Sequence, residues 1–272
     1  MSNTRTSAAA ASPSPVDAAR ATALVTGAGG GIGRAIALGL ADAGFDVALV
    51  DLKAGDALAE TLDEVERRGA RGVALSGDLA DVATHGPMLD EAERALGPLA
   101  CLVNNAGVTV LTRGDLLDVS PQAFDHCLTV NTRGTFFLTQ AFARRLLGRP
   151  GARAHRSIVT ITSSNAQAAS VERAEYCVSK AALSMVTALF AVRLGAAGIG
   201  VYEVVPGLID TPMSAASRTR YDADIARGWL VQPRWGRPDE VARVVTTLAQ
   251  GLLPYTVGQR IHVDGGMLIP KD

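Results

Sequence analysis

The sequence has few aromatic residues, few lysines and few cysteines, and its cysteines form no recognisable motif. Aromatic side chains make up only 4% of its 272 residues, so we expect a core of Ala, Val, Leu and Ile. Three cysteines, Cys101, Cys127 and Cys177, cannot all pair, and none has metal-type spacing with the four histidines. We therefore expect no metal site, and we expect reduced, buried thiols, as in a cytoplasmic protein.

Strong net charge and long apolar runs are also missing. The formal net charge is −1 and the isoelectric point is near 6.4, which gives no reason to expect a nucleic acid as partner. No uninterrupted apolar run approaches the roughly 18 residues of a membrane span, so no membrane is expected. The length is ample for one large domain with a buried core.

Lysine is rare enough for its positions to be informative. Only three of the 26 basic residues are lysines, Lys53, Lys180 and Lys271. Lys180 follows Tyr176 by four residues, which places both on one face of a helix. A free tyrosine titrates near pH 10, and a neighbouring ammonium favours its phenolate form, so the pair predicts an acid/base group. A hydroxyl, Ser163, lies thirteen residues before the tyrosine. The alternative is a surface lysine on an amphipathic helix.

A glycine-rich turn follows the first apolar run. Residues 21–26 predict a strand, which ends in Gly27-x-x-x-Gly31-x-Gly33 with Ile32 inside the turn, and a helical pattern comes next. A strand, a glycine turn and a helix place backbone N–H groups and a helix N-terminus against a pyrophosphate. This pattern favours a dinucleotide site, although a tight connection between strand and helix is the simpler alternative.

The next predicted strand, 46–51, ends in an acid. Asp51 lies eighteen residues beyond Gly33, where a carboxylate accepts hydrogen bonds from the adenosine ribose hydroxyls and repels a 2′-phosphate. The sequence therefore favours NAD over NADP, although Lys53 stands two residues further on.

Strands and helices alternate along the rest of the chain. Further strands are predicted at 72–76, 99–103, 157–162, 200–205 and 259–263, and helices at about 55–68, 83–96, 121–147, 174–197 and 238–250. This order is typical of an α/β fold, here a single-domain, Rossmann-type, doubly wound sheet of seven parallel strands with helices on both faces. Ligands of such sheets bind beyond the carboxyl ends of the strands.

The domain plan is simple. Residues 1–20 are rich in Ala, Ser and Pro and predict a disordered tail, whereas 21–272 form a dinucleotide-binding catalytic domain with a long connection at about 207–237 after the sixth strand. Between positions 214 and 237 the chain has five arginines against two acids. This local excess favours recognition of an anion by the connection; alternatively, these arginines are solvated or pair with neighbouring acids.

Several motifs occur in one order. They are Gly27-x-x-x-Gly31-x-Gly33, Asn104-Asn105-Ala106-Gly107, Asn131, Ser163, Tyr176-x-x-Ser179-Lys180, Pro206-Gly207 and Val263-Asp264-Gly265-Gly266. With these motifs the chain resembles the short-chain dehydrogenases/reductases over residues 21–268. It is most similar to the branch with 3-oxoacyl-(acyl-carrier-protein) reductases and NAD-linked sugar and polyol dehydrogenases.

The resemblance implies a role for each matching residue. Tyr176 would be the general acid/base, Lys180 would support its phenolate and hold the nicotinamide ribose, Ser163 would bind the substrate oxygen, and Asn131 would position a water in a proton relay. The implied contacts of the cofactor are with Asp78 and Leu79, Asn105, Ala106 and Gly107, Pro206 and Gly207, and Ile209 and Thr211. The resemblance also implies that the long connection at about 207–237 is a lid over the substrate.

Two departures from the family pattern bear on specificity. Reductases of fatty-acid synthesis generally use NADPH and have a basic residue where this chain has Gly30 or Leu52. Many members have a glycine soon after the serine, where this chain has Asn165-Ala166-Gln167. We therefore expect an NAD-dependent oxidoreductase acting on a secondary alcohol or ketone. The alternatives are an NADPH-dependent 3-oxoacyl-(acyl-carrier-protein) reductase and, more remotely, an inactive dinucleotide-sensing protein.

Two predicted helices are apolar on more than one side. The apolar residues are Phe136, Phe137, Leu138 and Phe142 in one helix, and Leu183, Met185, Val186, Leu189, Phe190 and Val192 in the other. Such helices are usually buried on more than one side, and the resemblance implies that these two form a subunit interface. We expect a homotetramer, with scattered surface leucines as the alternative.

Overall fold

A seven-stranded parallel sheet forms the centre of the protein. The computed structural model describes residues 20–149, 154–215 and 217–271. All neighbouring strands are parallel, as predicted, and the strand order is β3-β2-β1-β4-β5-β6-β7. The strands are β1 (Ala21–Thr26), β2 (Phe45–Asp51), β3 (Gly72–Ser76), β4 (Leu99–Asn104), β5 (Arg156–Ile161), β6 (Ile199–Pro206) and β7 (Arg260–Val263).

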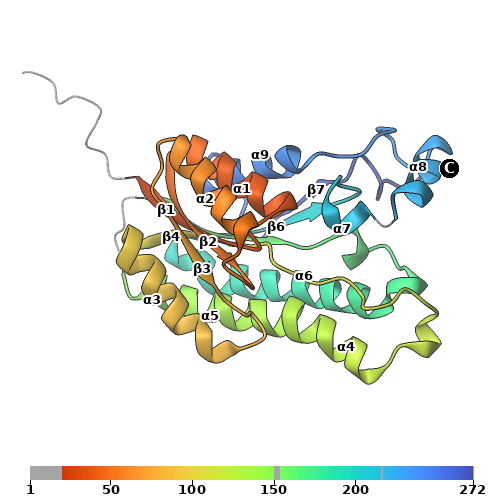
Figure 1. Cartoon of the computed structure of the whole chain (residues 1–272), viewed down its shortest axis with the longest axis horizontal. Coiled ribbons are helices and arrows are strands. Elements are labelled where there is room, and N and C mark those ends of the chain that lie inside the picture. Colours follow the sequence, from red (N-terminus) through yellow and green to blue (C-terminus); the bar gives the residue numbers. More distant parts are fainter. Residues whose placement is uncertain (1–19, 150–153, 216, 272) are drawn as a thin grey trace, which may run out of the picture.

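Helices cover both faces of the sheet (Figure 1). One layer contains α1 (Gly31–Asp42), α2 (Asp56–Arg67) and α9 (Pro238–Ala249), and the other contains α3 (His85–Leu96), α5 (Thr135–Leu147) and α6 (Ala174–Leu194). Each layer packs its aliphatic side chains on one face of the sheet, for example Ile36 on one side and Leu138 on the other. Because both faces are covered, the central strands are apolar throughout, and β4 and β6 are buried over their whole length.

The predicted strand boundaries agree with the structure to within one residue, because apolar runs bounded by glycine and polar residues end where the strands do. The predicted helical segment over 121–147 is continuous in the structure, but its middle is a π-helix that the sequence did not predict. The structure has α4 (Pro121–Cys127), a π-helix (Leu128–Gly134) and then α5. A π-turn adds a residue to a helix without breaking it, so the helical pattern on either side does not reveal it.

The helix α6 crosses the core. Together with the short turns on either side, Val171–Ala197, it is long and apolar enough by composition to cross a membrane, which uninterrupted runs did not reveal. In this protein the helix packs against β6, and its Lys180 and Leu183 are buried. We therefore interpret it as a core helix.

The predicted tail lies outside the described residues except for Arg20, which belongs to the folded part. Its guanidinium donates to the carbonyls of Ala41 and Phe45 at 2.8 and 3.2 Å and lies 3.3 Å from the carboxylate of Asp46. Asp46 is 1% exposed and also receives hydrogen bonds from Arg71. A buried acid is thus paired where β2 begins.

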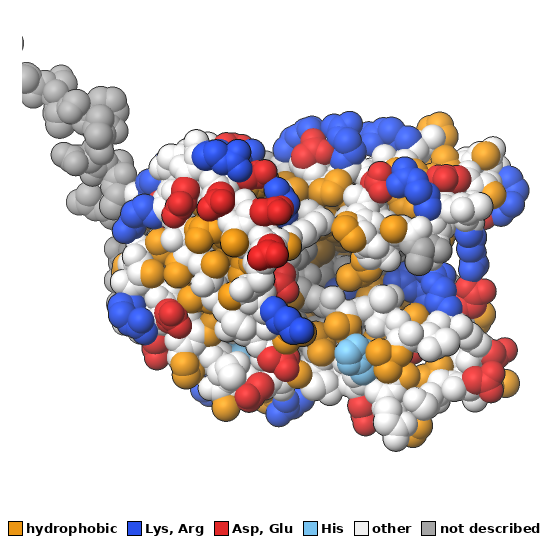
Figure 2. Space-filling model, in the orientation of Figure 1, with side chains coloured by type: hydrophobic (Ala, Val, Ile, Leu, Met, Phe, Trp, Pro, Cys, Tyr) orange, Lys and Arg blue, Asp and Glu red, His pale blue; other side chains and the backbone are white. Residues whose placement is uncertain are grey.

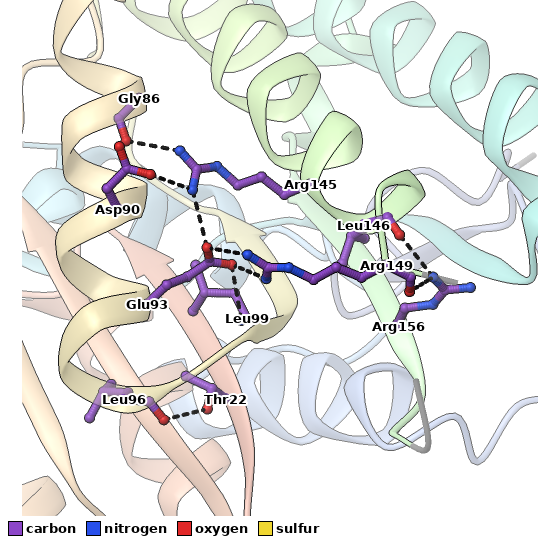
Figure 3. A network of polar contacts seen from close by, with 10 residues as sticks. All are labelled: Thr22, Gly86, Asp90, Glu93, Leu96, Leu99, Arg145, Leu146, Arg149 and Arg156. Carbon is purple, nitrogen blue, oxygen red and sulfur yellow. Dashed lines mark hydrogen bonds and ion pairs between the residues drawn. The ribbon is translucent and has the colours of Figure 1, made fainter. Parts of the chain in front are cut away.

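A second group of paired charges joins α3 to α5 near the amino ends of β1 and β4 (Figure 3). We call Asp90, Glu93, Arg145 and Arg149 the Glu93 cluster. Arg149 donates to both carboxylate oxygens of Glu93, at 2.6 and 2.8 Å, and Arg145 bridges Glu93 and Asp90, at 3.1 and 2.7 Å. Burial raises the pKa of Glu93, but the hydrogen bonds from Arg149 and from the backbone of Leu99 outweigh this and hold it below its usual range.

Candidate active site

A cleft of about 1110 Å³ lies across the carboxyl ends of the strands, under the segment predicted as a lid. Figure 2 shows it as a hollow near the middle of the molecule. The lid contains two short helices, α7 (Pro212–Ala215) and α8 (Arg218–Ala226). Every candidate site residue from the sequence lines this cleft except Asn131.

The glycine turn closes one side of the cleft. Gly27 and Gly31 have φ angles of 67° and 53°, which other residues rarely adopt. At Gly33 an added Cβ would lie only 1.9 Å from the carbonyl oxygen of Gly27, so the turn packs tightly against the start of α1. The N-cap of α1 is Gly30, and no side chain caps this end. First-turn N–H groups are therefore free for an anion, and the turn fits a pyrophosphate.

Asp51 lies at the end of the cleft beside this turn. Its Oδ2 accepts a hydrogen bond from the backbone N–H of Gly29 at 2.9 Å, and its Oδ1 accepts one from Leu52 at 2.8 Å. The neighbouring lining residues Leu52, Asp78 and Leu79 are acidic or apolar. This end of the cleft therefore fits an adenosine ribose with free hydroxyl groups and offers a 2′-phosphate no cation among its lining residues.

The floor of the cleft is held by a residue that the sequence motifs did not identify. The Oγ1 of Thr26 accepts hydrogen bonds from the backbone N–H groups of Asn105 and Ala106, both at 3.0 Å. The side chain of Asn105 in turn donates to the carbonyl of Thr26 at 2.9 Å. The last residue of β1 thus fixes the loop after β4. A threonine at the end of an apolar run is too common for the sequence to mark this role.

Tyr176 and Lys180 lie on the inner face of α6, as their spacing predicts. The ammonium nitrogen of Lys180 is 5.8 Å from the centroid of the Tyr176 ring and donates to the carbonyl of Ile161 at 3.1 Å. Lys180 is 4% exposed, and among the described residues no carboxylate forms an ion pair with it. A buried cation without an anionic partner is costly, which is typical of a functional site. The phenolate form of Tyr176 would supply a negative charge close to it.

The tyrosine ring packs in a small apolar cluster with Val110 and Cys127. Burial raises the pKa of the Cys127 thiol to about 11, so this thiol stays neutral beside the ring at neutral pH.

Ser163 follows β5 at the edge of the sheet and lines the same part of the cleft. Its Oγ accepts a hydrogen bond from the backbone N–H of Asn165 at 3.1 Å. Because this bond uses only a lone pair, the hydroxyl hydrogen stays available for an oxygen in the cleft.

Asn131 lies behind the cleft lining. Its side chain is fully buried: Oδ1 accepts from the backbone of Val108 at 2.8 Å, and Nδ2 donates to Val108 and to the Oγ of Ser179, at 3.0 and 2.9 Å. All of these partners belong to the protein, and the role of Asn131 in positioning a relay water stays a prediction. Asn131 ties the loop after β4 to α6 from the middle of the π-helix.

The lid arginines are paired. Arg218, Arg220, Arg227, Arg234 and Arg237 form ion pairs with Asp210, Glu172, Asp224, Glu240 and Asp239, respectively. The basic excess seen in the lid sequence is thus largely neutralised, partly by acids from outside the lid. Ion pairing, the second interpretation of these arginines, agrees with the structure.

The substrate end of the cleft has basic and aromatic residues that no motif singled out. They are Arg113, Arg173, Arg220, Tyr221 and Trp229. Arg113 and Arg220 both lie beside Glu172, at 3.6 and 2.5 Å, and so connect the loop after β4 and the lid to the turn before α6. The sequence drew attention to Arg220 only as one of the lid arginines, and it did not single out Arg113 or Arg173, because arginine is abundant throughout this chain.

A parallel sheet, a glycine turn aimed at a cleft and a tyrosine–lysine pair define a dinucleotide-linked oxidoreductase. Residues 27–268 match the protein family described as enoyl-(acyl carrier protein) reductase. The chain belongs to the short-chain dehydrogenase/reductase family, and it acts as an NAD(P)-linked oxidoreductase on an alcohol or ketone.

Its curated relatives have different substrates in their names. The chain is 30% identical to a 2-dehydro-3-deoxy-D-gluconate 5-dehydrogenase of Dickeya dadantii, over 87% of this chain and 91% of that protein. It is 33% identical to a 3-oxoacyl-(acyl-carrier-protein) reductase of Staphylococcus aureus, over 87% of this chain and 93% of that protein.

Solved structures include complexes with both dinucleotides. A 3-oxoacyl-(acyl-carrier-protein) reductase from Brucella melitensis in complex with NAD superposes with a TM-score of 0.90 at 42% identity, over 93% of this chain and 99% of that one. A putative 2-deoxy-D-gluconate 3-dehydrogenase from Agrobacterium tumefaciens with bound NADP gives 0.81 at 34% identity, over 92% and 97%.

Proposed function

We propose that the protein is an NAD-dependent oxidoreductase that interconverts a secondary alcohol and a ketone. The observation that carries this proposal is the buried ammonium of Lys180, which has no ion-pair partner among the described residues and lies beside the ring of Tyr176, in a cleft whose other end is formed by Asp51. An inactive dinucleotide sensor could use Lys180 to hold a ribose, but it would gain nothing from placing this charge beside a tyrosine hydroxyl in the cleft.

The protein's own groups supply the proton chemistry. In oxidation, the phenolate of Tyr176 takes the proton of the substrate hydroxyl, and Lys180 stabilises the negative charge of the phenolate before that transfer. The hydroxyl of Ser163 donates to the substrate oxygen and stabilises negative charge that develops there. NAD, when bound, supplies the hydride acceptor. In reduction, Tyr176 returns its proton to the ketone oxygen.

The preference for NAD is supported by the carboxylate of Asp51 and by the lack of a cationic side chain among the neighbouring lining residues. A 2′-phosphate in this place would meet a like charge. The NAD complex of the Brucella melitensis protein agrees with this proposal, and the NADP complex of the Agrobacterium tumefaciens protein makes a direct test necessary.

A second candidate function is reduction of a 3-oxoacyl thioester. The names of the Brucella melitensis and Staphylococcus aureus proteins favour it, whereas Asp51 disfavours the NADPH that such an enzyme would use. The two candidates share the chemistry of Tyr176 and differ in substrate and dinucleotide.

The experiment is an oxidation screen of polyols, hydroxy acids and steroid alcohols with NAD and with NADP, followed by the fluorescence of the reduced dinucleotide. We expect turnover with NAD. Turnover confined to 3-oxoacyl thioesters with NADPH would instead establish the second candidate.

Two variants of Asp51 distinguish the effect of its negative charge from the effect of its hydrogen bond to the glycine turn. Asp51→Asn keeps an acceptor for the N–H of Gly29 and removes the charge, and Asp51→Ala removes both. Loss of a like-charge repulsion should shift the NADP/NAD ratio of kcat/KM by roughly 1–3 kcal/mol in both variants. A wild-type preference for NADP would contradict the proposed role of Asp51.

We also propose a cytoplasmic homotetramer. Four apolar side chains on the outer face of α6 support the assembly: Val178, Met185, Leu189 and Val192 are 46%, 60%, 56% and 87% exposed. Their helical spacing makes one stripe that a second copy would cover. The three free cysteines support a reducing compartment. Sedimentation at micromolar concentration tests the assembly, and a monomer would contradict it.

A further inference from the structure

Arg173 occupies a central place at the substrate end of the cleft. The carbon of its guanidinium is 4.3 Å from the centroid of the Tyr176 ring, and its Nη1 donates to the Oδ1 of Asn165 at 3.1 Å. The backbone N–H of the same asparagine donates to Ser163. The guanidinium therefore contacts the ring of the proton-transferring tyrosine and is one residue removed from the serine.

The charge of Arg173 is not neutralised by the protein. Among the described residues, the other two arginines that line the cleft pair with Glu172, whereas Arg173 forms no ion pair. Its side chain is half-buried, and its Nε is buried without a hydrogen-bond partner. Leaving a desolvated cation and a buried donor unpaired costs free energy, so a group that enters the cleft and pairs with Arg173 would be bound strongly.

The surrounding charges add to this effect. Arg113 and Arg220 share the single carboxylate of Glu172, and Asp224 is paired with Arg227. The substrate end of the cleft therefore keeps a positive excess after the ion pairs are counted. This excess favours an anionic substrate over a neutral alcohol.

We propose that Arg173 binds the carboxylate of the substrate and that the substrate is a small hydroxy acid or the corresponding keto acid. This inference rests on the proposed function. The guanidinium is planar and, when it lies over an aromatic ring, keeps N–H groups at its edge for a carboxylate.

The position of Arg173 also limits the size of the substrate. Because Arg173 touches the Tyr176 ring, the anion that it binds is only a few bonds from the carbon that loses hydride. The charged groups of a carrier-bound thioester lie on the far side of the acyl chain, away from this position. Arg173 therefore favours a free acid over the carrier-bound substrate of the second candidate function.

Asn165 holds the side chain of Arg173 in its place at the cleft. The side chain of Asn165 accepts from Arg173 and also donates to the carbonyl of Ala168 at 3.1 Å, so it fixes the guanidinium at the cleft wall. We therefore assign Asn165 as the positioning residue for Arg173.

The experiment compares short 2- and 3-hydroxy acids with their methyl esters as substrates, with NAD as cofactor. We expect the wild type to prefer each acid over its ester, and Arg173→Met to lose about 30- to 150-fold in kcat/KM on the acid, as for a lost charge-assisted contact. On the ester, the variant should stay within about threefold of the wild type. The matched control is Arg227→Met, a lid arginine that does not line the cleft, which should leave both substrates within about threefold.

A binding measurement supports the kinetic one. Calorimetric titration of malonate into the protein saturated with NADH should show binding that weakens at least about tenfold in Arg173→Met. Arg173→Lys, which keeps the charge but loses the planar fork, should fall between the two. Asn165→Ala should raise KM for the acid more than it lowers kcat.

Each other outcome is decisive. Equal losses on acid and ester in Arg173→Met would overturn the inference, because the residue would then act through Tyr176. Equal rates of the wild type on acids and esters would overturn it while leaving the proposed function intact. Malonate binding that depends on Arg173, in a protein that oxidises no alcohol with either dinucleotide, would uphold the anion site and overturn the proposed function.

Discussion

The two ends of the parallel sheet differ in whether their buried charges are paired. At the amino ends of the strands, acids are held by arginines: Asp46 by Arg71, and Glu93 by Arg149. At the carboxyl ends, the cations Lys180 and Arg173 point into the cleft without an ion-pair partner among the described residues. Both ends belong to the same strands and share one core.

This difference separates stability from function. A buried charge that is paired contributes to holding helices and strands together, whereas a buried charge left unpaired costs free energy and acts on whatever enters the site. Substitutions in the Glu93 cluster should therefore lower the free energy of unfolding without lowering the catalytic rate. Substitutions in the cleft should lower the catalytic rate without lowering the free energy of unfolding. The following substitutions test this separation.

The largest expected effect is that of Tyr176→Phe. The phenol oxygen has no hydrogen-bond partner among the described residues, so its removal should leave the unfolding midpoint unchanged. The variant should lose roughly 10²- to 10⁴-fold in kcat, the usual contribution of a general acid/base, and should bind NAD within a few-fold of the wild type. Steady-state kinetics and urea unfolding measure the two properties. Near-wild-type turnover would refute the proposed mechanism.

Glu93→Ala is expected to lower stability and to leave the catalytic rate unchanged. The side chain of Glu93 is 11% exposed and serves two arginines, so its loss should lower the free energy of unfolding by about 2–3 kcal/mol. The kcat/KM per folded molecule should stay unchanged.

The matched control is Asp90→Ala in the same cluster. Its side chain is 65% exposed, so the loss should be below about 1 kcal/mol. If Glu93→Ala lowered kcat as strongly as stability, the two ends of the sheet would not be independent.

The smallest effect is expected of Glu172→Gln, at the boundary between cleft and lid. Since its pairs with Arg113 and Arg220 are exposed, KM should rise less than about fivefold. The hydrogen bond and charge of Arg220 hold the pKa of Glu172 below its usual range. A lowered pKa means that the pairing is complete above the usual glutamate pKa of about 4.3 and is lost as pH falls through the lower value.

The rate of lid proteolysis in the wild type should therefore be independent of this group at neutral pH and should rise only in acid. In Glu172→Gln it should already be raised at neutral pH, and the two proteins should become alike once acid has removed the charge of Glu172. Identical proteolysis of the two proteins at pH 7 would show that these pairs do not hold the lid.

Most of the sheet and its ligand edge could be predicted from the sequence, because short apolar runs, glycine turns and the residues just after them repeat along the chain. The π-helix could not, since Asn131 and its neighbours continue an ordinary helical pattern. Its bonds from Asn131 to Val108 and Ser179 join residues far apart in the chain.

The ion-pair partners of the arginines could not be predicted from the sequence either. The sequence showed a cluster of lid arginines but not that Arg220 pairs with Glu172, which lies before α6. It also did not distinguish Arg173 from the other arginines, because only the fold places this guanidinium on the Tyr176 ring without a carboxylate. Pairing across the sheet edge depends on distances in space, and local patterns do not record them.

The π-helix changes how the protein responds to the loss of a residue. Each residue of a regular helix turns the chain by about 100°, since a turn takes 3.6 residues. Removing one residue between Leu128 and Gly134 would convert the wide turn into a regular one and leave α5 facing the sheet, because the wide turn already absorbs one extra residue. Removing one residue from the start of α5 would instead rotate the rest of that helix by about 100°, and Leu138 and Phe142, both fully buried, would then face away from the sheet. Homologues should therefore accept the loss of one residue in the π-helix more readily than in α5.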